Sequence, residues 1–129
     1  MKLKLFIPAV VLLLSSFNII QAQKIMEVNS KEASTMLQKD TKLVVLDVRT
    51  AEEFNDGHVK GAINIDIRQP DALNKIDKLD RNAKYIVHCR TNHRSKMAVD
   101  HMLQSGFKNI YQMMDGYMGW AQNGLPAEK

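Results

Sequence analysis

The chain of 129 residues is 45% hydrophobic and 25% charged, a balance typical of one globular domain that argues against disorder. Its formal net charge of +4 is modest, and no basic stripe is interleaved with aromatic residues, so no nucleic-acid partner is expected. Cys89 is the single cysteine, which excludes an intramolecular disulfide.

The N-terminal stretch has the three parts of a secretory signal peptide. Lys2 and Lys4 form a basic start, residues 5–20 are mostly apolar, and Ala22 offers a small residue at the cleavage point. The pattern predicts a signal peptide over residues 1–22 and a protein exported to a bacterial periplasm or secreted. Cleavage removes two lysines and no acid, which lowers the formal net charge from +4 to +2. An uncleaved anchor is the alternative, although polar residues interrupt the apolar run and make it a poor membrane span.

The rest of the chain, residues 23–129, alternates strand-like and helix-like patterns. Residues 24–28 predict a first strand, and Asn29 with Glu32 resembles a capping box that opens a helix. The inner face of this helix carries Ala33, Met36 and Leu37. The continuous apolar run over residues 43–48 is typical of a strand covered on both faces.

A second capping box, Thr50 with Glu53, predicts a short helix that carries Phe54 inward and ends at Gly57. A turn is expected over residues 58–61. The next segments are a third strand over residues 62–65, a helix begun by Pro70 that reaches about Leu79, and a fourth strand over residues 85–88. The core-facing residues of that helix are Leu73 and Ile76.

A helix pattern then opens near Ser95 and runs to Gly106, a suitable C-terminal cap. Its expected buried residues are Met97, Ala98, Met102 and Leu103. A fifth strand over residues 109–113 and a last helix over residues 117–122, ended by Gly124 and Pro126, complete the chain. Alternating strands and helices predict an α/β fold, a single small domain with a five-stranded, mostly parallel sheet and helices on both faces.

Cys89 lies where the fourth strand gives way to a helix. The positive partial charge of a helix N-terminus, with Arg90 and Arg94 nearby, favours the thiolate, which is the nucleophilic form. A buried structural cysteine is the alternative, and the two arginines favour the reactive interpretation. Asp47 and Arg49 also follow a strand, so they share a crevice with Cys89 at the carboxyl ends of the sheet.

Three segments resemble motifs of rhodanese-like domains, in the same order and spacing and over essentially all of the chain after the signal peptide. They are residues 46–64, with LDVR, EF and GHVKGAIN; the loop CRTNHRS at residues 89–95; and residues 115–126, with DGYMGW and GLP. Two positions depart from the family pattern. Asn92 replaces a usual glycine in the loop and is expected to tolerate its left-handed backbone conformation. Asp115 replaces the first of two glycines.

The resemblance implies a sulfurtransferase. Cys89 would attack a sulfane sulfur donor such as thiosulfate, become a persulfide and pass the sulfur to a thiol or cyanide acceptor. Backbone amides of the loop would cradle the outer sulfur, and Arg90 and Arg94 would hold an anionic donor. The substrate-binding residues implied are Arg90, Thr91, Asn92, His93, Arg94 and Ser95. A redox protein partner is expected to keep the exported thiol reduced.

The remaining polar residues are interpreted as supporting the site. Asp47 and Arg49 would support the loop by hydrogen bonds or pair with Glu53, with an ordinary structural ion pair favoured. His88 should point away from Cys89, because consecutive strand residues face opposite sides. No cluster of His, Asp and Glu has metal-ligand spacing, so no metal and no cofactor are expected. Structural roles are also expected for His58, Met113, Met114, Met118 and Trp120, while His93 is a donor contact or a surface residue.

Two other functions compete with sulfur transfer. Four residues separate Cys89 from Arg94, one fewer than in rhodanese-related phosphatases and arsenate reductases. The shorter loop suits a single sulfur atom better than a tetrahedral oxyanion. The non-enzymatic alternative is an exported persulfide carrier or protein-binding module with little turnover.

Overall fold

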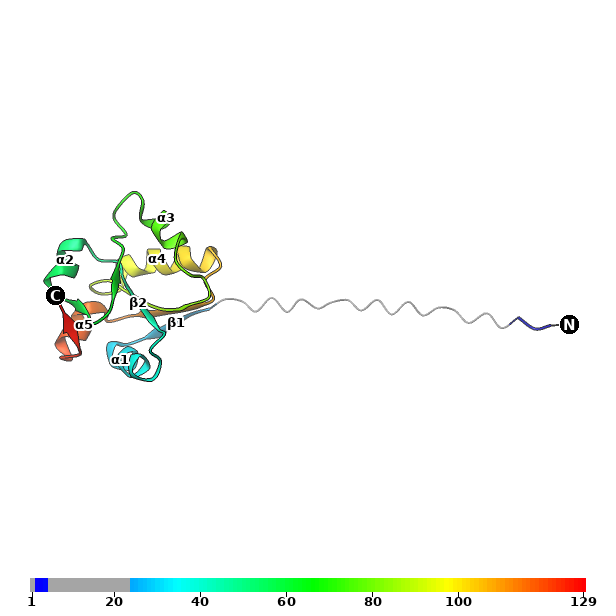
Figure 1. Ribbon diagram of the computed structural model, residues 1–129, viewed down its shortest axis with the longest axis horizontal. Helices are drawn as coiled ribbons and strands as arrows, with labels where there is room; N and C mark the ends of the chain where they lie inside the picture. The colour runs from blue at the N-terminus through cyan, green and yellow to red at the C-terminus, as the bar shows by residue number, and fades with distance from the viewer. Residues whose placement is uncertain (1, 5–23) are drawn as a thin grey trace.

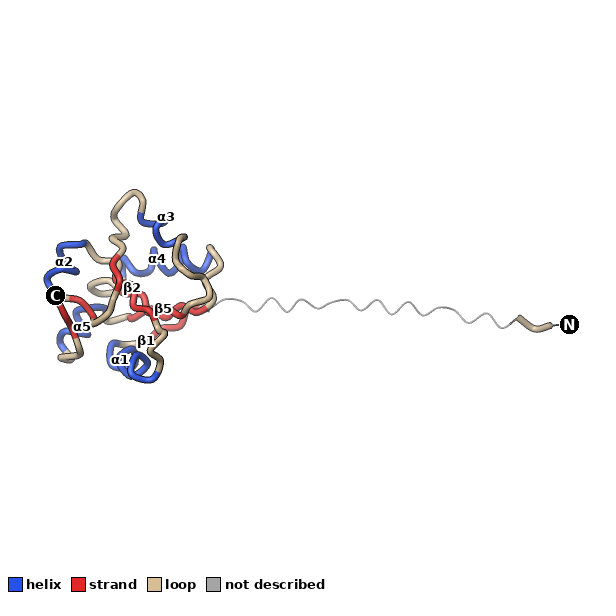
Figure 2. Tube along the Cα trace, in the orientation of Figure 1, coloured by secondary structure: helices blue, strands red, loops and turns tan. Residues whose placement is uncertain are grey.

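The structure is a computed structural model that describes residues 2–4 and 24–129. Its centre is a five-stranded, fully parallel sheet in the order β1-β6-β5-β2-β4 (Figures 1 and 2). These strands are β1 (Ile25–Val28), β2 (Val44–Asp47), β4 (Ile63–Asn64), β5 (Lys84–His88) and β6 (Asn109–Met113). The predicted α/β fold class is therefore confirmed. The signal peptide expected over residues 1–22 lies, apart from residues 2–4, outside the described residues.

Helices cover both faces of the sheet, as Figure 1 shows. On one face lie α3 (Ala72–Asp77) and α4 (His93–Gln104), and on the other lie α1 (Ser30–Lys39) and α5 (Gly116–Gln122). Leu46 and Val87 join the core beneath α3 and α4, whereas their neighbours Val45 and Ile86 join the core beneath α1 and α5. This alternation follows from the period of two in a strand and explains why the central strands are apolar throughout.

Capping groups fix where two helices begin. At α2 (Ala51–Asp56), Thr50 and Glu53 form the predicted capping box, with both reciprocal bonds present. At α1, the Asn29 side chain accepts a hydrogen bond from the Glu32 amide at 2.8 Å. The Glu32 carboxylate accepts from the side chain of Asn29 and not from its backbone. Only one of the two reciprocal bonds of the predicted capping box is therefore present.

A small second sheet lies where a turn was expected. β3 (His58–Val59) pairs antiparallel with β7 (Ala127–Glu128), so residues 58–59 form a strand where a turn was predicted. The turn itself is confirmed at residues 60–61, where the Ala62 amide donates to the Val59 carbonyl at 3.0 Å. Strands of two residues are too short to show a period, and this pairing joins segments far apart in the sequence. The pairing brings the end of the chain against the segment that follows α2.

Two predictions of buried side chains are also wrong. Leu73 of α3 is 43% exposed, because Ala72 and Ile76, one turn apart, form the buried side of that helix. Met97 of α4 is 60% exposed. The buried stripe of α4 consists of Ser95, Ala98, Val99 and Met102, at the i, i+3, i+4 and i+7 spacing.

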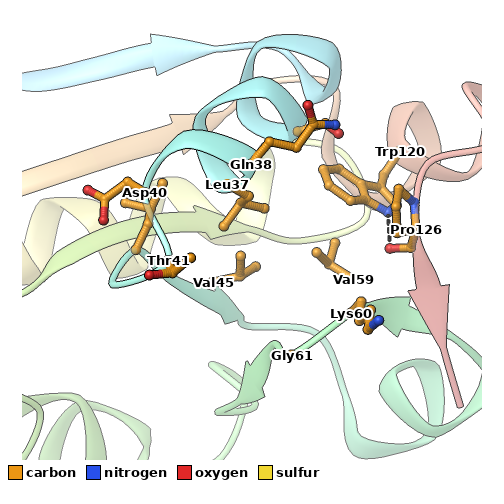
Figure 3. A pocket seen from close by; sticks show the side chains of 12 residues that line it. Leu37, Gln38, Asp40, Thr41, Val45, Val59, Lys60, Gly61, Trp120 and Pro126 are labelled. Atoms are coloured by element: carbon orange, nitrogen blue, oxygen red, sulfur yellow. Dashed lines mark hydrogen bonds between the residues drawn. The ribbon is translucent and has the colours of Figure 1, made fainter.

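Trp120 anchors α5, as predicted, and is 2% exposed. Its indole N–H donates to the carbonyl of Pro126 at 3.0 Å, which satisfies the buried nitrogen and holds the chain leading to β7 (Figure 3). The ring forms one wall of a groove between α1 and β3, with Leu37 and Val59 among its neighbours (Figure 3). This groove belongs to the α1 and α5 side of the sheet, whereas Cys89 joins the core beneath α4.

Candidate active site

Cys89 directly follows β5 and is only 1% exposed. Strand alternation places its side chain with Tyr85 and Val87, on the side of α4. The thiol donates to the hydroxyl of Ser95, with Sγ 3.7 Å from Oγ. That hydroxyl donates to the carbonyl of Asn92 at 3.1 Å. The sulfur thus lies beside the first turn of α4, where unpaired helix amides favour negative charge.

The backbone of the loop is held by the N-terminus of α5. The amides of Tyr117 and Met118 donate to the carbonyls of Cys89 and Arg90, at 2.8 and 3.0 Å. In a trans peptide the C=O and the following N–H point in opposite directions. The N–H groups of Arg90 and Thr91 therefore point away from α5, an arrangement that leaves them free to bind an anion.

Gly116 allows this close approach. Its φ is +59°, and a Cβ there would lie 2.4 Å from the carbonyl oxygens of both Arg90 and Thr91. We expect Gly116→Ala to lower the free energy of unfolding by about 2–4 kcal/mol, through left-handed backbone strain and overpacking against the loop. Denaturant unfolding measures this loss.

Gly124→Ala is the matched control. Gly124 has a φ of +62°, but no atom lies within 4 Å of an added Cβ. This variant should lose only the backbone contribution of about 1–2 kcal/mol. Equal losses in the two variants would contradict a role for Gly116 in loop packing.

Asn92 does not adopt the expected left-handed conformation. Its φ is −144°, and every residue with positive φ among residues 24–129 is a glycine. Helix α4 begins at His93, two residues before the predicted start near Ser95, so Asn92 is its N-cap residue. The Asn92 carbonyl accepts hydrogen bonds from Ser95, Lys96 and Gln112, which fixes the end of the loop.

Arg94 makes a bidentate ion pair with Glu53 of α2. The two guanidinium nitrogens lie 2.6 and 2.9 Å from the two carboxylate oxygens, and both side chains are partly buried. The hydrogen bond from Arg94 lowers the pKa of Glu53 to about 2. Hydrogen bonding to Glu53 likewise raises the pKa of Arg94. The positive charge of Arg94 is therefore already paired with a carboxylate in this structure.

Asp47 and Arg49 pair with each other beneath the loop and not with Glu53. The Arg49 guanidinium contacts both Asp47 oxygens at 2.7–3.0 Å and donates to the Gly57 carbonyl. It also stacks 4.1 Å from the centre of the Tyr117 ring. This buried pair thus supports the segment of α5 whose amides hold the loop.

His88 lies between this ion pair and the backbone of Cys89. As predicted, its side chain points away from the thiol and faces Tyr117, with ring centres 6.4 Å apart. Nδ1 lies 2.9 Å from the Cys89 carbonyl, and Nε2, which has no hydrogen-bond partner, lies 3.7 Å from Asp47. Burial lowers the pKa of His88, so the neutral imidazole is favoured, with Nδ1 donating to the carbonyl.

The other loop side chains reach solvent. Arg90, Thr91 and His93 are exposed. Arg90 lines an open pocket of about 250 Å³ together with Arg49, Glu53, Asp56, Gly57, Tyr117 and Met118. Six residues were proposed from the sequence to bind substrate, and only the Ser95 hydroxyl contacts the Cys89 sulfur. Arg94 is paired with Glu53, and Asn92 is the N-cap residue of α4. The other three, Arg90, Thr91 and His93, lie at the surface.

Within the described part of the chain, no three His, Cys, Asp or Glu residues are arranged to bind a metal ion. No helix among the described residues is long and apolar enough to cross a membrane.

The sequence model of the rhodanese-like domain matches residues 29–123, which include the whole arrangement from α1 to α5. The chain belongs to the rhodanese-like family. The thiosulfate sulfurtransferase 16 of Arabidopsis thaliana chloroplasts is 37% identical in an alignment 93 residues long, which covers 64% of this chain and 78% of that protein. The putative sulfur carrier protein YrkF of Bacillus subtilis is 27% identical over 77% of this chain and 52% of its own length. The crystal structure of a rhodanese-related protein from Thermoplasma volcanium has a TM-score of 0.68 at 29% identity, covering 80% and 97% of the two chains.

Two supporting residues of this rhodanese-like domain were missed by sequence reasoning. Gln112 of β6 is buried and donates to the Ser95 hydroxyl and to the Asn92 carbonyl, at 3.0 and 3.1 Å. Asp115 accepts from the backbone and side chain of Ser30, at 2.8 and 2.6 Å, and ties α5 to α1. A polar residue between the apolar residues Tyr111 and Met113 was the available signal for Gln112, and the departure from glycine was the signal for Asp115.

Proposed function

We propose that this chain is a sulfurtransferase that carries sulfur as a persulfide on Cys89. The proposal rests chiefly on the position of the Cys89 thiol, buried between the end of β5 and the N-terminus of α4 and next to the Ser95 hydroxyl. Membership of a family with relatives named as a sulfurtransferase and a sulfur carrier supports it.

Sulfur transfer takes two displacement steps. The Cys89 thiolate attacks the outer sulfur of a donor such as thiosulfate, the S–S bond of the donor breaks, and sulfite leaves with the bonding electrons. A thiolate or cyanide acceptor then attacks the outer sulfur of the persulfide, and the Cys89 thiolate leaves. Neither step needs an oxidant, a metal or a general base, because every leaving group departs as a stable anion.

The loop would stabilise the anionic forms of Cys89 by fixed backbone charge. The first turn of α4 and the amides of Arg90 and Thr91, turned away from α5, supply positive partial charge that costs no reorganisation during the reaction. Arg90 and Arg94 would add charge towards the donor. Because Cys89 is almost fully buried, a single sulfur atom fits this role better than a larger group.

The YrkF relative favours a second candidate, a persulfide carrier with little turnover. Two assays separate the candidates. In the first, thiosulfate and cyanide are both present, and an enzyme forms thiocyanate repeatedly. In the second, the protein loaded with thiosulfate is separated from the donor and then mixed with cyanide or with a small thiol. A carrier loads once and gives up its sulfur only to a particular protein thiol. Failure to load with any sulfane sulfur donor would overturn both candidates.

We propose further that the protein is exported and begins near Gln23 after cleavage, in a bacterial periplasm or outside the cell. The basic start, the apolar stretch and Ala22 support this proposal. N-terminal sequencing of the protein from its native host should find a chain that begins near Gln23. A chain that begins at Met1 would contradict cleavage, and retention in a membrane fraction would favour the uncleaved anchor.

A further inference from the structure

The ion pair between Arg94 and Glu53 changes the charge that a sulfur donor meets. Glu53 engages both terminal nitrogens of Arg94, at 2.6 and 2.9 Å. Its Oε1 atom also accepts from the backbone and hydroxyl of Thr50, at 3.3 and 3.1 Å, within the capping box of α2. The carboxylate is thus held in place from its own helix as well as from Arg94, and it is ionised at neutral pH.

Glu53 also lies beside a pocket at the edge of the loop that begins with Cys89. It lines the pocket of about 250 Å³ that contains Arg90. The other charged residues of that pocket are Arg49, which is already paired with buried Asp47, and Asp56. The positive charges of Arg49, Arg90 and the paired Arg94 are balanced by three negative charges, those of Glu53, Asp56 and the paired Asp47. This pocket therefore has no net positive charge to attract a dianion.

We propose that Glu53 determines donor specificity, selecting against dianionic donors in favour of sulfane sulfur compounds that carry one negative charge or none. The inference rests on the proposed function, since it concerns the donor that loads Cys89. Organic persulfides and thiosulfonates are the chemical classes that fit. Thiosulfate carries two negative charges and would load Cys89 more slowly than donors of these classes.

The physical reason is a competition for Arg94. A dianion that binds the guanidinium must either share it with the carboxylate or displace Glu53 from a bidentate contact. Sharing brings three negative charges against one positive charge, whereas displacement leaves Glu53 without its partner. The repulsion from a carboxylate is proportional to the charge of the donor, so a monoanion meets half of it.

The test compares thiosulfate with methanethiosulfonate, in which a methyl group replaces one charged oxygen. Both donors give up their outer sulfur to a thiolate, releasing sulfite from thiosulfate and methanesulfinate from methanethiosulfonate. The rate of persulfide formation on Cys89 is measured for each donor by mass spectrometry in the wild type and in Glu53→Gln. Glutamine keeps an oxygen for the Thr50 bonds, so helix α2 is preserved.

Glu53→Gln should raise the loading rate by about tenfold with thiosulfate and by about threefold with methanethiosulfonate, as expected for repulsion proportional to donor charge. Glu52→Gln removes the same charge from an exposed position of the same helix and should change either rate by less than about twofold. Equal changes with the two donors, or a fall with thiosulfate alone, would show that Glu53 only positions Arg94 and would overturn the inference.

A second measurement uses the wild type alone. The ratio of its loading rate with methanethiosulfonate to its loading rate with thiosulfate should exceed the same ratio for an uncharged small thiol by about threefold or more. A preference no greater than that of the small thiol would overturn the inference without affecting the proposed function. Loading by neither donor, and by no organic persulfide, would instead overturn the proposed function itself.

Discussion

Replacing Cys89 with serine should abolish sulfur loading and transfer while leaving the fold intact. A serine hydroxyl is a far weaker nucleophile unless a base activates it. The imidazole of the adjacent His88 faces away from the side chain of position 89, with its Nδ1 on the Cys89 carbonyl. No other thiol exists in the chain to replace it.

The loading assay with thiosulfate and with an organic persulfide measures this effect, and thermal unfolding checks the fold. Ser95→Ala is an informative companion, because it removes the hydroxyl 3.7 Å from the sulfur and keeps the thiol. That variant should still load. Sulfur transfer by Cys89→Ser at the wild-type rate would rule out the persulfide mechanism.

Arg94→Ala should lower the rate of loading by thiosulfate by about ten- to a thousandfold, the cost of losing a charge-assisted contact at a partly desolvated site. The loss has two parts in this structure, because the variant removes a positive charge and leaves the Glu53 carboxylate without its partner. A neutral donor should lose much less, since the loop amides proposed to hold the outer sulfur remain in place.

The measurement is the loading rate with both kinds of donor, in the wild type and in Arg94→Ala. Arg68→Ala provides the control, because Arg68 is exposed and lies outside the loop. Equal losses with the charged and the neutral donor would mean that Arg94 shapes the loop and does not bind donor charge. Its assignment as a donor-binding residue would then be withdrawn.

Local patterns were sufficient to predict most of the fold. The apolar run over residues 43–48 becomes β2 because both faces of that strand are covered, and the capping box of Thr50 and Glu53 starts α2 as expected. The same patterns place Cys89 at the end of β5 and turn His88 to the opposite face. Each of these features depends on residues that are close together in the sequence.

Contacts between distant segments could not be predicted in this way. Glu53 and Arg94 are 41 positions apart, and nothing in either local sequence distinguishes this ion pair from a pairing of Glu53 with Arg49. The contact of Asp115 with Ser30 spans 85 positions, and the β3–β7 pairing involves two residues on each side. Such contacts arise only once the sheet has brought the elements together, and one of them, the ion pair of Glu53 with Arg94, changes the charge near Cys89.

The mass of the peptide containing Cys89, measured after wild-type protein meets a panel of sulfane sulfur donors, tests the central claim most directly. The panel would contain thiosulfate, methanethiosulfonate and an organic persulfide. We expect at least one donor to increase the mass by one sulfur atom at Cys89, and a thiol to reverse the increase. A protein whose Cys89 gains no sulfur from any of the three donors would contradict the account.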